Sequence, residues 1–201
     1  MTASRRLNKK KTVLLVLLLL IISVTGVYCA LESEYVQKKF FYPLLYTKEI
    51  NKFANENNLK PWFVASIIRN ESGFKADVTS SSGAIGLMQV MPETGSWIAQ
   101  KKEIDNFQES LLREPEVNIA FGCWYLNDLW QEFNDEKIVI AAYNAGRGQV
   151  KSWLDEKKWN GKDVEAIPFK ETREYVKNVL HDKERYKNLY QDAWNNKNLD
   201  V

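Results

Sequence analysis

The sequence predicts a mostly α-helical domain preceded by a single N-terminal transmembrane helix. Three observations support this fold class: a charge-free apolar run near the N-terminus, apolar residues at helical spacing through the rest of the chain, and no alternating strand pattern of useful length. The 201 residues suffice for one ordinary domain and an appendage. The formal net charge of +2 is nearly balanced, which argues against general nucleic-acid binding.

The N-terminal segment divides into a basic stretch and an apolar one. Residues 1–12 are rich in Lys and Arg and are expected to stay in the cytoplasm. Residues 13–31 carry no charge and can span a bilayer, which needs about 20 residues. A cleaved signal peptide is the alternative, but residues 27–29 match a small-residue cleavage site poorly, and Tyr28 stands where a lipoprotein cysteine is normally preceded by a small residue. We therefore expect an uncleaved, single-pass anchor in the cell membrane, with the rest of the chain outside.

The remaining chain reads as a connector, a helical domain and a tail. Residues 32–43 are a mixed, partly aromatic connector, and residues 44–194 form the expected domain. Apolar periodicity and helix-start signals predict helices that begin near Thr47, Pro61, Pro92, Pro115, Asp135, Val150 and Thr172. The polar residues 195–201 are expected to be a disordered tail.

Glu71 is the candidate catalytic residue, at the end of the helix that Pro61 opens. Three apolar residues share its helical stripe: Val64, Ile67 and Ile68. Gly73 then terminates the helix. Burial and the negative end of the helix dipole both disfavour a charged carboxylate, so the pattern predicts a proton retained near neutral pH, as a general acid requires. The alternative is an ordinary surface glutamate at a frayed helix end.

The segment after Glu71 carries a family resemblance. Its small hydroxyl residues and glycines let the backbone approach a ligand closely. Here the chain resembles the catalytic core of the soluble lytic transglycosylase family, which is related to goose-type lysozymes. The matching pieces are Glu71-Ser72, residues 83–92 (GAIGLMQVMP) and residues 142–146 (AYNAG). The resemblance covers roughly residues 44–190 and implies a lysozyme-like helical domain with a glycan-binding groove.

The resemblance also implies a set of substrate-binding residues. These are Ser80, Met88, Gln89, Tyr143, Asn144, Glu165 and Tyr175. In the family, the serine that matches Ser80 contacts the catalytic carboxyl group and the sugar. From the residues alone, Ser80 could equally form a turn, Met88 could pack in the core, and Asn144 could cap a helix. The two tyrosines could simply pack, and the glutamate could be a loop charge.

The function implied by the resemblance is that of a peptidoglycan lytic transglycosylase. Glycosidases usually need two carboxylates, but substrate-assisted enzymes are an exception. Glu71 would protonate the oxygen of the β-1,4 bond between N-acetylmuramic acid and N-acetylglucosamine. It would then take a proton from the muramic acid 6-hydroxyl, and ring closure onto C1 would give a 1,6-anhydro end. Asp77 and Glu93 are nearby carboxylates that could instead support hydrolysis. A hydrolytic muramidase on the same fold and a non-catalytic glycan-binding protein therefore stay open.

No cofactor and no metal site are expected, because the chain has one His and no Cys pair at ligand spacing. Cys29 lies in the membrane segment and Cys123 in an expected buried helix, so no disulfide between them is expected. The expected partners are peptidoglycan glycan strands, the membrane through the N-terminal helix, and other cell-wall machinery.

Overall fold

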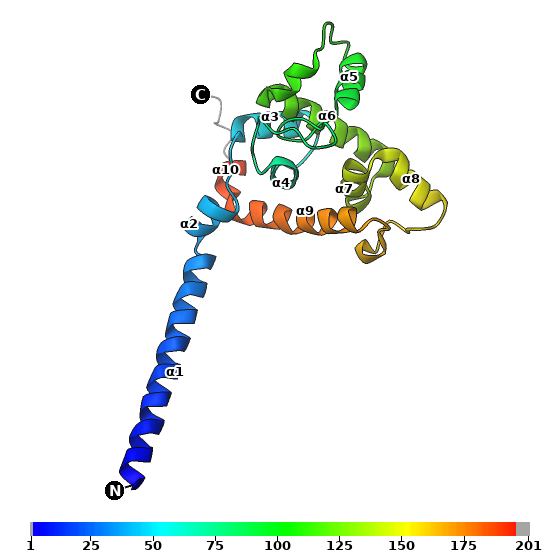
Figure 1. Cartoon of the computed structure of the whole chain (residues 1–201). Coiled ribbons are helices and arrows are strands. Elements are labelled where there is room, and N and C mark those ends of the chain that lie inside the picture. The colour runs from blue at the N-terminus through cyan, green and yellow to red at the C-terminus, as the bar shows by residue number, and fades with distance from the viewer. Residues whose placement is uncertain (1, 196–201) are drawn as a thin grey trace. The chain divides into compact units, whose positions relative to one another are not determined.

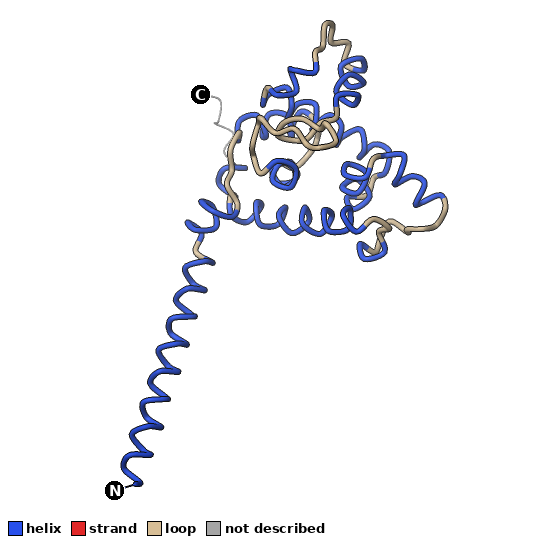
Figure 2. Tube along the Cα trace, viewed as in Figure 1, coloured by secondary structure: helices blue, strands red, loops and turns tan. Residues whose placement is uncertain are grey.

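The computed structural model describes the backbone of residues 2–195, and among these residues it contains helices and loops but no strand (Figures 1 and 2). The mostly α-helical prediction is therefore confirmed. Residue contacts divide the chain into two compact units, residues 1–43 and residues 44–201. Of the tail expected from residue 195 onward, only Asn195 is described, as the last residue of a helix; residues 196–201 lie outside the described part.

The N-terminal unit consists of one long helix and two short ones. Helix α1 spans Thr2–Glu32, so the basic stretch and the apolar run belong to the same helix. Its residues Lys11–Glu32 are long and apolar enough to cross a membrane, and the apolar side chains along it are exposed. The expected connector is helical as well: α2 covers Glu34–Val36, and a π-helical turn, η1, covers Gln37–Phe41.

The C-terminal unit is built from helices joined by loops. In order they are α3 (Thr47–Glu56), α4 (Pro61–Ser72), α5 (Pro92–Lys101), η2 (Glu109–Arg113), α6 (Pro115–Phe133), α7 (Glu136–Ala145), α8 (Arg147–Asp155), η3 (Val164–Ala166), α9 (Lys170–Leu189) and α10 (Gln191–Asn195). A proline opens α4, α5 and α6, where its missing N–H is not needed.

Helix α4 forms the centre of this unit. It packs against α3 and α9, and α9 packs also against α7. The side chains of Val64, Ile67 and Ile68 are completely buried, as the predicted stripe requires. Full burial of such a side chain contributes about 1.5–3 kcal/mol. The helix that carries Glu71 is therefore held firmly in the core.

The irregular segment between α4 and α5 is fastened to the core by one side chain. The buried amide of Asn118, on α6, accepts a hydrogen bond from the Met88 N–H at 2.7 Å and donates to the carbonyl oxygens of Ile85 and Leu112 at 2.8 and 2.7 Å. Gly86 has φ +79°, and a Cβ there would lie 2.4 Å from Nδ2 of Asn118. Glycine is thus required at this position, both for backbone conformation and for space.

Candidate active site

Glu71 lies in the last turn of α4, partly buried, and receives a hydrogen bond from α9. The hydroxyl of Tyr175 donates to its Oε1 at 2.5 Å. Burial raises the pKa of Glu71 to about 7; the hydrogen bond from Tyr175 lowers it, and the nearby carboxylate of Glu171 raises it. This carboxyl group is therefore poised to exchange a proton near neutral pH.

Tyr175 is nearly buried, with 9% of its surface exposed, so it packs in the core and also reaches the candidate acid. Burial, followed by the charge of Glu71, raises the pKa of its phenol well above the usual value. The phenol consequently stays protonated and acts as a donor. The burial agrees with the packing alternative for Tyr175, and its part in substrate binding stays a prediction.

Tyr143, on α7, points its hydroxyl at the loop backbone. It donates to the carbonyl oxygen of Met88 at 2.7 Å. Burial raises the pKa of the Tyr143 phenol well above the usual value, and the charge of Glu71 raises it further. Tyr143 is therefore close enough to Glu71 to interact with its charge. Tyr143 therefore connects the 83–92 segment to the surroundings of the acid.

A pocket of about 230 Å³ is lined by residues from both of the later matching segments, residues 83–92 and residues 142–146. Its lining residues come from the loop before α5, from α5, from α6 and from the end of α7: Gln89, Val90, Met91, Thr94, Tyr125, Tyr143, Asn144, Ala145 and Gly146. It is smaller than the about 300–1,000 Å³ typical of small-ligand sites. Such a pocket suits one portion of a longer ligand.

Three of the predicted residues shape the loop itself. The Nε2 of Gln89 donates to the carbonyl oxygen of Gly86 at 2.8 Å, and Gln89 has φ +47°. The side chain of Met88 is fully buried and packs beside Gly122, which supports the core-packing alternative for its side chain. The Oγ of Ser80 accepts the N–H of Ala84 at 3.0 Å, which supports the turn alternative.

The other two predicted residues bond to α9. The Oδ1 of Asn144 accepts the hydroxyl of Thr172 at 2.7 Å, which ties the end of α7 to α9. Glu165, in η3, is exposed and forms an ion pair with Lys177 at 2.8 Å. Among the residues with described side chains, no cluster of His, Cys, Asp and Glu is arranged to hold a metal ion.

Sequence reasoning missed a cluster around Arg147, directly after the 142–146 segment. Its guanidinium pairs with Asp128 and, at 3.0 Å, with Glu132, and it lies over the rings of Trp97 and Tyr125. Tyr125 lines the pocket. The cluster thus fixes one wall of the pocket by joining α8 to α5 and α6. The aromatic residues spaced along α5 and α6 were its only sequence signal.

A mostly helical domain that carries a partly buried glutamate with a raised pKa is what a glycan-cleaving protein of the lysozyme-like class is expected to show. The sequence matches the Transglycosylase SLT domain family over residues 48–165 and the soluble lytic transglycosylase helical domain over residues 166–195. The chain belongs to the Transglycosylase SLT domain family. The family resemblance of the sequence is confirmed.

Relatives and solved structures agree with this assignment. A soluble lytic murein transglycosylase of Salmonella typhimurium is 36% identical over 164 residues, which are 79% of this chain and 25% of that protein. A membrane-bound lytic murein transglycosylase C of Actinobacillus pleuropneumoniae is 30% identical over 165 residues, 70% of this chain and 45% of that protein. The 70 kDa soluble lytic transglycosylase of Escherichia coli superposes with a TM-score of 0.69 at 36% identity, covering 76% of this chain and 26% of that one. The chain thus spans about a quarter of the length of the soluble relatives it matches.

Proposed function

We propose that this chain is a peptidoglycan lytic transglycosylase. It would cleave the β-1,4 bond between N-acetylmuramic acid and N-acetylglucosamine and leave 1,6-anhydro-N-acetylmuramic acid ends. The observation that carries the proposal is Glu71, held partly buried with a pKa of about 7 and bonded to Tyr175. Family membership and the names of the relatives support the coarser part of the proposal, that the chain is a lytic murein transglycosylase.

In the first step the Glu71 carboxyl group gives its proton to the glycosidic oxygen while the bond from that oxygen to C1 of the muramic acid breaks. The acetamido oxygen of the substrate stabilises the positive charge at C1. Glu71 is then a carboxylate, and the hydrogen bond from Tyr175 favours that form. The hydrogen bond from Tyr175 thus stabilises the negative charge that the first step creates on Glu71.

In the second step the Glu71 carboxylate takes the proton of the 6-hydroxyl, and that oxygen bonds to C1. Glu71 ends protonated as it began, and no water is consumed. A pKa near 7 suits both steps, because a general acid or base works best when its pKa lies near the working pH.

The positions of other carboxylates support a single-acid mechanism over hydrolysis. Asp77 and Glu93, the candidates for a second carboxylate, are both exposed. The carboxylate that raises the pKa of Glu71 is Glu171, which is also exposed. In the mutant structure of the related Pseudomonas aeruginosa enzyme, a glutamate-to-glutamine replacement gives an inactive protein. This agrees with dependence on one glutamate.

The N-terminal helix supports a membrane-anchored form of the enzyme. Residues 11–32 can cross a membrane, and some relatives are named membrane-bound. We infer a single-pass anchor with the domain of residues 44–194 on the cell-wall side, where glycan strands and other cell-wall machinery would be within reach.

Mass spectrometry of digested peptidoglycan tests the proposal. Full-length protein in detergent micelles is incubated with purified sacculi, and the released fragments are analysed. Anhydro ends are expected from the wild type and none from Glu71→Gln, which should keep the circular dichroism spectrum of the wild type. Reducing ends would instead identify a muramidase. Equal release by the wild type and Glu71→Gln would remove Glu71 from its role.

A further inference from the structure

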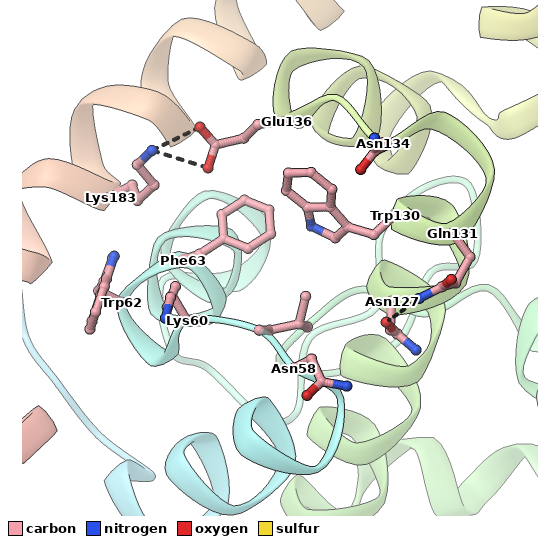
Figure 3. A pocket seen from close by; sticks show the side chains of 11 residues that line it. Asn58, Lys60, Trp62, Phe63, Asn127, Trp130, Gln131, Asn134, Glu136 and Lys183 are labelled. Atoms are coloured by element: carbon pink, nitrogen blue, oxygen red, sulfur yellow. Dashed lines mark hydrogen bonds and ion pairs between the residues drawn. The ribbon is translucent and has the colours of Figure 1, made fainter.

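A second and larger hollow, of about 680 Å³, opens near the N-terminal end of α4 (Figure 3). Trp62 and Phe63, the second and third residues of α4, take part in its lining, whereas Glu71 is the eleventh. At 1.5 Å per residue, Trp62 and Glu71 are separated by about 13 Å along the helix axis. None of the predicted site residues lines this hollow. It is therefore separate from the candidate active site.

The hollow has an apolar floor and aromatic walls. Leu59 and Phe63 are 6% and 3% exposed and close its base. Trp130, on α6, lies beside Phe63, and Trp62 stands at the opposite side (Figure 3). Both indoles are partly exposed. The face of an aromatic ring carries partial negative charge and attracts polarised C–H groups, such as those on the apolar face of a sugar ring.

Side-chain amides are gathered at the rim of the hollow. They belong to Asn58, Asn127, Gln131 and Asn134. Each amide offers both donors and acceptors, as do sugar hydroxyl and acetamido groups. The Nε2 of Gln131 donates to Oδ1 of Asn127 at 3.4 Å, which sets two of these amides side by side (Figure 3). Neutral groups of this kind suit a ligand with many hydroxyls.

The charges around the hollow argue against a phosphate ligand. Lys183 is paired with Glu136 at 2.8 Å, and the ammonium of Lys60 lies over the ring of Trp62, 6.0 Å from its centroid. The two helices that begin here do not present a row of open N–H groups: Pro61 occupies the first position of α4, and the Asp135 side chain already accepts from the first turn of α7. An anion site at a helix start needs such groups.

We propose that this hollow is a second binding site for N-acetylated glycan. It would hold part of the polymer on the indoles of Trp62 and Trp130 and on the rim amides, while the cut is made at Glu71. The identity of the polymer rests on the proposed function, but binding in the hollow does not require cleavage. A second contact with the strand would keep the enzyme on insoluble peptidoglycan between cuts.

The test uses the full chain in detergent micelles with Glu71→Gln, so that glycan is not cut. Trp62→Ala and Gln131→Ala are added to this parent one at a time, because both side chains are accessible and their loss should leave the fold intact. Gln108→Ala is the matched control, an exposed glutamine away from the hollow. The probes are the tetramer of N-acetylglucosamine, followed by calorimetry, and intact sacculi, followed by co-sedimentation.

The parent should show two classes of tetramer site. Trp62→Ala should weaken one class by about tenfold, and Gln131→Ala should weaken it by a smaller factor, since aromatic anchors contribute most at binding sites. Retention on sacculi should fall in both variants and not in Gln108→Ala. A single class of sites, or unchanged binding in Trp62→Ala and Gln131→Ala, would overturn the inference. If the wild type makes anhydro ends but the hollow fails this test, the second site is refuted and the proposed reaction stands. If anhydro ends are missing but tetramer binding depends on Trp62, the proposed reaction is refuted and the second site stands.

Discussion

Replacing Tyr175 with phenylalanine removes the hydroxyl that donates to Oε1 of Glu71 at 2.5 Å. That bond opposes burial, which raises the pKa of Glu71 to about 7. A hydrogen bond to a charged group contributes roughly 1.5–3 kcal/mol, and one pKa unit corresponds to about 1.4 kcal/mol. The pKa of Glu71 should therefore rise by roughly one to two units in Tyr175→Phe.

Two changes in the rate are expected. In the proposed mechanism the first step needs the protonated carboxyl group, so the high-pH limb of the rate profile should move upward by about one to two pH units. The maximal rate should fall by roughly tenfold to a hundredfold, because the carboxylate that forms in this step loses its donor. The assay is the initial rate of fragment release from sacculi between about pH 5 and pH 9.

Tyr143→Phe is the matched control for this experiment. It also loses one phenol hydroxyl from the same region, but that hydroxyl donates to the carbonyl oxygen of Met88 and not to Glu71. Its high-pH limb should stay near that of the wild type. A limb that is unmoved or lowered in Tyr175→Phe, or an equal upward shift in both variants, would refute the reasoning that Tyr175 sets the proton affinity of the acid.

Three further predictions concern stability. The pKa of Glu71 is raised from 4.5 to about 7 in the folded state, so ionisation of this group lowers the stability of the wild type as the pH rises through that window. In thermal melts, the free energy of unfolding of Glu71→Gln should equal that of the wild type near pH 4. It should exceed that of the wild type by up to about 3 kcal/mol near pH 8. An equal difference at both pH values would contradict this. Asn118→Ala breaks three buried hydrogen bonds and should lower the free energy of unfolding in urea by about 3 kcal/mol or more. Asn178→Ala, at an exposed position inside α9, should not lower it. Gly86→Ala and Gly83→Ala both place a Cβ at positive φ, but only the Cβ at position 86 would collide with Asn118. Gly86→Ala should therefore be more destabilising than Gly83→Ala by about 1–3 kcal/mol. Similar losses of stability in the two variants would show that the collision is relieved.

Local signals in the sequence were sufficient to predict the helix that carries the acid. Pro61 at the start, the apolar stripe of Val64, Ile67 and Ile68, and Gly73 at the end are all near neighbours, and the structure shows α4 with those bounds. The apolar N-terminal helix could be predicted in the same way, because the length needed to cross a membrane and the lack of charge are both properties of one segment.

Contacts between distant segments could not be predicted from such patterns. Asn118 reads as one polar residue inside an apolar helix, and only the fold shows that its amide holds the loop of residues 85–88. Arg147 reads as a charge after a glycine, yet it joins two carboxylates and two aromatic rings. The hollow near Trp62 and Trp130 combines residues from α4, α6, α7, α9 and the loops before α4 and α7, none of which forms a motif alone.

If Glu71 is the acid of the proposed reaction, its bond to Tyr175 makes the packing of α4 on α9 matter for chemistry as well as for stability. The two residues are 104 positions apart in the chain, and their bond exists only because these two helices pack together. Burial without that bond would raise the pKa of the carboxyl group further, which would make it a weaker acid in the proposed first step. A phenol that stays protonated supplies the opposing influence without adding charge. A substitution that loosens the α4–α9 contact should therefore alter the pH profile before it measurably unfolds the domain.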